Sequence, residues 1–102
     1  MSKRQKIVAR GPAALARAIG LTTKEASEWQ VQYALLKRLQ QVVQTGGLTH
    51  AEVARRGGSS RTRVTAILNG NLDHVSTDLL IRLLVGLGYR VRVSVSRTTR
   101  AA

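Results

Sequence analysis

The chain of 102 residues contains no cysteine and no phenylalanine, and one tryptophan and two tyrosines are its only aromatic residues. Without cysteine, neither disulfides nor thiolate metal sites can form, which fits a reducing compartment such as the cytoplasm. The core has to be built from Leu, Val, Ile and Ala. Stacking of bases on aromatic side chains, the usual way to hold single-stranded nucleic acid, has almost no material here.

Acidic residues are also scarce, since five Asp and Glu stand against seventeen Lys and Arg and give a formal net charge of +12. Such an excess favours a polyanionic partner, either nucleic acid or an anionic membrane surface. No apolar run approaches the roughly 18 residues of a membrane-spanning helix. The first ten residues, MSKRQKIVAR, lack the apolar region of a signal peptide. We therefore expect double-stranded DNA as the partner, no membrane association, and a cytoplasmic, nucleoid-associated protein.

Arrangements of residues typical of metal sites and of catalytic sites are missing too. His50 and His74 have no third donor at ligand-like spacing, so we expect no metal site. The carboxylates precede or open predicted helices, where negative charge is stabilising. No nucleophile, base and orienting residue come together, and no glycine-rich phosphate loop follows a strand. These absences predict a protein that is not an enzyme and takes neither a cofactor nor a small-molecule substrate.

Apolar residues recur at steps of three and four along most of the chain, which indicates a mainly α-helical fold. Thr49, Ser60 (or Ser59) and Ser76 are candidate N-caps, and glycines follow each helical pattern. The predicted organisation is a basic tail at 1–11, a helical domain at 12–88, a β-strand at 89–96 and a tail at 97–102. About five helices are expected, at 13–19, 22–45, 49–56, 60–69 and 77–87.

The stretch LTHAEVARRGGSSRTRVTAILNG, residues 48–70, places two short helical patterns on either side of Gly57-Gly58-Ser59-Ser60. Isolated helices shorter than about 12–15 residues are marginal in water, so each needs the other and the flanking helices. Two short helices joined by a glycine-containing turn form a helix-turn-helix motif, whose second helix enters the DNA major groove. Arginines cluster around this turn, where they would meet phosphates and base edges.

The same segment resembles the Xre/Cro-like (lambda-repressor-like) helix-turn-helix family. That family has the pattern Leu-Thr-Gln-Ala-Glu-hydrophobic-Ala, then a glycine turn, then a recognition helix opened by serine. The matching positions are Leu48, Thr49, Ala51, Glu52, Val53, Ala54, Gly58, Ser60, Val64, Ile67 and Gly70. The likeness covers roughly residues 20–96. Within the family, the chain is similar to small HigA-type antitoxins and their transcriptional relatives. This likeness implies a sequence-specific DNA-binding transcriptional regulator that represses its own promoter, and a RelE-like toxin as a partner.

Three positions depart from the family pattern. His50 stands in place of a glutamine that contacts a phosphate and braces the recognition helix, and histidine can keep one hydrogen bond of that role. Gly57 and Ser59 stand in place of apolar residues packed under the turn, so we expect a looser turn.

The outward side of the second motif helix is the predicted DNA surface. Arg61 and Arg63 are assigned to guanine or phosphate, and Thr65 to a base or a thymine methyl group. The alternative is a solvated basic face, and for Asn69 phosphate contact and simple capping are both open. Trp29 and Tyr33 are expected in the core, with a partner-binding patch as the alternative. The predicted DNA-binding set is His50, Ser59, Ser60, Arg61, Thr62, Arg63, Thr65 and Asn69.

Residues 89–96 alternate strictly and put three valines on one face of a strand. A lone strand cannot satisfy its backbone groups, so it must pair with a second copy, with residues 6–9, or with the sheet edge of a partner protein. Pairing in a homodimer is preferred because it presents two recognition helices about 34 Å apart to a palindrome. The predicted dimer interface is Leu83, Leu87, Val91, Val93 and Val95. Two other functions remain open, a protein-interaction factor with weak DNA binding and a non-specific architectural DNA-binding protein.

Overall fold

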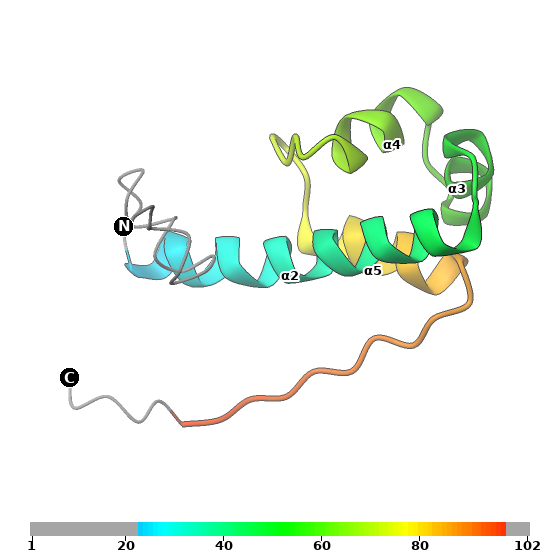
Figure 1. Cartoon of the computed structure of the whole chain (residues 1–102). Coiled ribbons are helices and arrows are strands. Elements are labelled where there is room, and N and C mark those ends of the chain that lie inside the picture. The colour runs from blue at the N-terminus through cyan, green and yellow to red at the C-terminus, as the bar shows by residue number, and fades with distance from the viewer. Residues whose placement is uncertain (1–22, 98–102) are drawn as a thin grey trace, which may run out of the picture.

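The computed structural model describes residues 23–97, which form four helices followed by an extended C-terminal segment (Figure 1). The helices are α2 (Thr23–Gly46), α3 (His50–Gly57), α4 (Arg61–Leu68) and α5 (Thr77–Gly86). The predicted helix at 13–19 lies outside the described residues. Each of the other four predicted helices is confirmed to within one or two residues at either end.

Side-chain caps define where the short helices begin. The hydroxyl oxygens of Thr49, Ser60 and Ser76 each accept a hydrogen bond, at 3.1 Å, from the backbone N–H three residues later. Each cap satisfies one of the N–H groups that a helix start leaves without a partner. At the other end, Gly47 terminates α2 with φ of 63° and Gly58 terminates α3 with φ of 72°. Left-handed backbone of this kind is adopted readily only by glycine.

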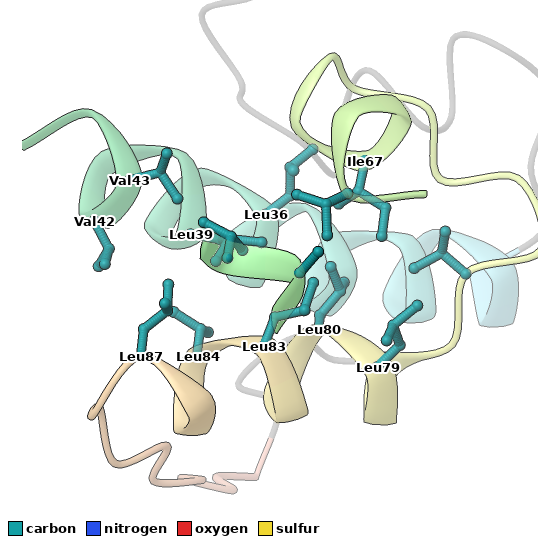
Figure 2. Packing of buried hydrophobic residues seen from close by; sticks show 14 residues of the cluster. Leu36, Leu39, Val42, Val43, Ile67, Leu79, Leu80, Leu83, Leu84 and Leu87 are labelled. Carbon is teal, nitrogen blue, oxygen red and sulfur yellow. The ribbon is translucent and has the colours of Figure 1, made fainter. Parts of the chain in front are cut away.

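The core lies between α2 and α5 and is closed by α3 and α4. Figure 2 shows the leucines of α5 pointing toward Leu36 and Leu39 of α2, with Ile67 reaching in from α4. All buried hydrophobic side chains among the described residues are Ala, Val, Leu or Ile, as the composition predicted. Full burial of one such Leu or Ile contributes about 1.5–3 kcal/mol. This packing stabilises helices that are too short to be stable alone.

A pair of glycines sets the distance between α3 and α5. Gly57 is buried at the end of α3, where an added Cβ would collide with the Leu83 side chain and lie 3.3 Å from the Leu83 Cα. On the facing side, a Cβ on Gly86 would collide with the backbone carbonyl of Arg56 and lie 3.0 Å from the Gly57 Cα. The expectation of a looser turn is therefore wrong at Gly57. The missing side chain leaves no hole, because Leu83 of α5 occupies the space.

The C-terminal segment differs from the predicted strand. Within residues 23–97 no β-strand forms, and 89–97 runs as extended chain without a ladder partner. Val91 packs against the core, whereas Val93 and Val95 are 79% and 90% exposed. Leu83 and Leu87 are 0% and 7% exposed. Their assignment to a dimer interface does not fit this burial, because α5 turns both side chains into the core of its own copy.

We predict that Gly86→Ala lowers the free energy of unfolding by about 1–3 kcal/mol, since the new methyl group forces α3 and α5 apart. Gly46→Ala is the matched control, because a Cβ there meets Leu48 at an ordinary 3.5 Å. That control should leave stability unchanged or raise it slightly through helix propensity. Urea denaturation followed by circular dichroism measures both, and equal stability of the two variants would contradict the close contact.

Candidate nucleic-acid interface

Helix α4 lies over the second half of α2 and beside α3 (Figure 1). Val64 and Ile67 bury its inner side in the core. The Gln40 side-chain amide of α2 donates a 2.9 Å hydrogen bond to the backbone carbonyl of Leu68 in the last turn of α4. These contacts fix α4 from one side only, so its other side faces outward.

The outward face of α4 is centred on Thr62. A helix turns about 100° per residue, so Thr62, Ala66 and Asn69 lie along the line opposite the buried Val64 and Ile67. Thr62 and Asn69 are exposed, and Ala66 is half-buried. Ala66 lies on this outward face, although the predicted contact set does not include it. Small side chains on this line allow the helix backbone to approach a groove floor closely.

The two arginines of α4 lie on opposite flanks of this face. Both are exposed. The Arg63 guanidinium donates a 2.7 Å hydrogen bond to the backbone carbonyl of His74, in the loop before α5. For Arg61, no hydrogen bond or ion pair of the side chain is found within residues 23–97. Arg61 is thus the arginine whose donors are available, and Arg63 contributes charge while it ties α4 to the next loop.

His50 joins the two helices of the motif. Its Nδ1 lies 2.8 Å from the hydroxyl oxygen of Thr65, so the first residue of α3 is hydrogen-bonded to the middle of α4. The bracing role expected for His50 is therefore present in the structure. Because Thr65 is half-buried and engaged with His50, it sits at the edge of the outward face and not at its centre.

The start of α4 carries an unusual charge arrangement. The first turn of α3 holds Glu52 and that of α5 holds Asp78, and negative charge at such positions stabilises a helix. The first turn of α4 holds no acidic residue, and Arg61 and Arg63 occupy it instead. Positive side chains therefore add to the partial positive charge of the helix N-terminus. This corner of the molecule attracts anions.

The remaining predicted contacts surround that corner. Ser60 is exposed and its hydroxyl is used as the cap of α4, which resolves the choice between Ser59 and Ser60. Ser59 is half-buried in the turn, next to Gly58. On α3, Arg55 forms an exposed 3.5 Å ion pair with Glu52.

Trp29 and Tyr33 do not belong to the core. Their rings stack with centroids 4.9 Å apart and planes 19° apart, and both residues are only half-buried. With Lys37, whose ammonium group lies 5.9 Å from the Tyr33 ring centroid, they line an open groove between α2 and the loop at 70–73. The prediction of core positions is wrong because the periodic stripe of α2 extends beyond the reach of α5.

Among residues 23–97, no group of three or more His, Cys, Asp and Glu side chains is close enough together to hold a metal ion. None of the described helices combines the length and the apolar character needed to cross a membrane.

Comparison with protein families identifies the class of protein. A family described as a helix-turn-helix domain matches residues 20–96, well over half of the chain. The chain belongs to this helix-turn-helix family, and membership supports DNA binding by the α3–α4 motif. Comparison with curated proteins and with solved structures gave no match.

The link between His50 and Thr65 can be measured by a double-mutant cycle. We predict a coupling free energy of about 0.5–1.5 kcal/mol between His50→Ala and Thr65→Val, the range of a net hydrogen bond. His50→Gln should retain most of the stability, because the amide can still reach the hydroxyl group. Additive losses in the cycle, measured by urea unfolding, would show that the two side chains do not interact.

Proposed function

We propose that the protein is a sequence-specific regulator of transcription that binds double-stranded DNA as a homodimer. Helix α4 enters the major groove, and the exposed residues at its start and along its outward face make the contacts. The regulator acts as the antitoxin of a toxin–antitoxin operon and represses its own promoter. Family membership supports the DNA-binding part of this proposal.

The charge at the start of α4 carries the proposal. A helix without an acidic first turn, and with two arginines there, gives up stabilisation of about 0.3–1 kcal/mol for each unfavourable charge. A phosphate placed at this end would be stabilised by the same charges. Ser60, Arg61 and Arg63 therefore suit the DNA backbone at the rim of a major groove.

We assign base recognition to Arg61 and to the residues along the outward face of α4. Arginine donates two hydrogen bonds to the guanine edge, the most frequent specific contact in protein–DNA complexes. Thr62 and Asn69 add a hydroxyl and an amide, and Ala66 offers a methyl contact to thymine. Arg63 and His50, which are already hydrogen-bonded within the protein, contribute to phosphate binding and to the position of α4.

We expect Arg61→Ala to weaken binding to the preferred duplex by at least tenfold, while binding to unrelated duplexes changes little beyond the loss of one charge. Arg82→Ala is the matched control, because Arg82 is exposed on α5 and the variant loses the same charge. The preferred duplex is first selected from a random-sequence pool, and affinities are then measured by fluorescence anisotropy at several salt concentrations. Equal loss on all duplexes, or no selected sequence, would instead indicate a non-specific architectural protein.

A protein partner is the second function that an observation favours. The stacked Trp29–Tyr33 pair lies on an open groove beside the loop that follows α4, and aromatic residues are enriched at protein interfaces. In the antitoxin assignment, this groove takes part in binding a RelE-like toxin. Factors that act mainly on another protein, with weak DNA binding, would use the same surface.

The partner assignment predicts a RelE-like toxin gene beside the gene for this chain and is tested by co-expression of the two proteins. We expect the wild-type chain to relieve the toxin's growth arrest, and Trp29→Ala to reduce this relief without reducing DNA binding. Growth arrest that persists with the wild-type chain would contradict the antitoxin role and leave the DNA-binding role intact.

A further inference from the structure

The extended segment 89–97 has no ladder partner within residues 23–97, and its alternating side chains define two different faces. Val91, Val93 and Val95 lie on one face, and the residues between them are Arg92 and Ser94. Val91 already packs on the core, so this valine face is directed toward the body of the molecule where the segment begins. Farther along, Val93 and Val95 are exposed, and the backbone has no ladder partner within the described part of the chain.

In only one antiparallel register of this segment does every valine face a valine while no arginine faces an arginine. In an antiparallel pair, directly opposite residues share a face, and like charges placed opposite one another are destabilising. A two-fold axis at Val93 pairs Val91 with Val95 of a second copy, and Arg92 with its Ser94. The same axis pairs Arg90 with Ser96 and Tyr89 with Arg97, so no arginine faces an arginine.

Each neighbouring register sets either an arginine opposite an arginine or a valine opposite a residue other than valine. An axis at Arg92 places this arginine opposite itself, and an axis at Val91 places Arg90 opposite Arg92. An axis at Ser94 places Val91 opposite Arg97. An axis between two residues sets valines opposite serines or arginines and so places part of the valine face on the solvent side.

We propose that two copies of this chain pair through residues 89–97 as an antiparallel two-stranded ribbon with Val93 on the two-fold axis. This names the partner and the register of the dimer and rests on the homodimer in the proposed function. Val95 of each copy then lies beside the second copy's Val91, at the usual cross-strand distance of about 4.5–5.5 Å. Because Val91 packs on its own core, Val95 extends the hydrophobic surface of the other copy and loses its exposure to water.

Charge distinguishes this dimer from the DNA complex. Each copy carries a formal net charge of +12, so two copies repel one another over distances that salt screens. Raising salt from about 0.1 to 1 M shortens the Debye length from roughly 10 to 3 Å and should strengthen dimerisation. The same change should weaken DNA binding, because phosphate contacts release counterions.

Single-cysteine variants test the register, since the natural chain has no cysteine. Under mild oxidation, we expect Val93→Cys to form a disulfide-linked dimer at least about tenfold faster than Val91→Cys or Val95→Cys alone. In this register, residue 91 of one copy and residue 91 of the other lie four positions apart along the ribbon, and so do the two residues 95. Four positions correspond to roughly 13 Å at 3.3 Å per residue, which is too far for a disulfide. A mixture of Val91→Cys and Val95→Cys should cross-link between the two variants.

The mixture of Val91→Cys and Val95→Cys tests the register away from the two-fold axis. It therefore still decides the question if the geometry at residue 93 is unsuitable for a disulfide. Self-linking of Val91→Cys or Val95→Cys as fast as that of Val93→Cys would overturn the register. A wild-type chain that sediments as a monomer at high salt would overturn pairing with a second copy and favour the sheet edge of another protein. If the predicted cross-links form but no duplex is preferred, the ribbon stands and the proposed regulatory function fails.

Discussion

The close approach of α3 and α5 at Gly57 and Gly86 determines where the rest of the motif lies. With hydrogen in place of two side chains, the backbones of the two helices touch, and the Leu83 side chain fills the space beside them. This contact brings α3 onto the α2–α5 layer, and the turn at Gly58 then sets the direction of α4. A helix of eight residues is not stable by itself in water, so its orientation depends on the elements that pack against it. Its presentation to a partner depends on backbone contact two elements away.

Stability and binding make opposite demands on α4. Its inner side contributes Val64 and Ile67 to the core, its last turn is tied to Gln40, and its middle is joined to His50. Its first turn, in contrast, concentrates positive charge where helices favour negative charge. The core packing of α4 and its hydrogen bonds to Gln40 and His50 allow the unfavourable end to persist in the free protein, so the proposed anion site would be formed before any anion arrives. A preformed site of this kind loses little conformational entropy when it binds.

Much of this arrangement could be predicted from the sequence, because the signals are local. Thr49, Ser60 and Ser76 mark helix starts by reaching three residues along their own backbone, and that reach is visible in sequence spacing. The failures concern residues whose surroundings come from distant parts of the chain. The empty space expected at Gly57 is filled by α5, Arg63 is held by the His74 carbonyl, and Leu83 is enclosed by its own core. The helical period of α2 continued through Trp29, but nothing in that period tells how far along the helix the neighbouring layer extends.

The position of the single tryptophan has a consequence for optical spectroscopy. Trp29 lies at the rim of the groove beside the 70–73 loop, half in contact with water and stacked on Tyr33. Its fluorescence emission therefore reports on whatever occupies that groove and only weakly on the aliphatic interior. Quenching of this emission by a dissolved molecule such as iodide would follow the shielding of one surface and no other. The scarcity of aromatic residues thus gives the protein an intrinsic optical label on the side of α2 that the core leaves uncovered.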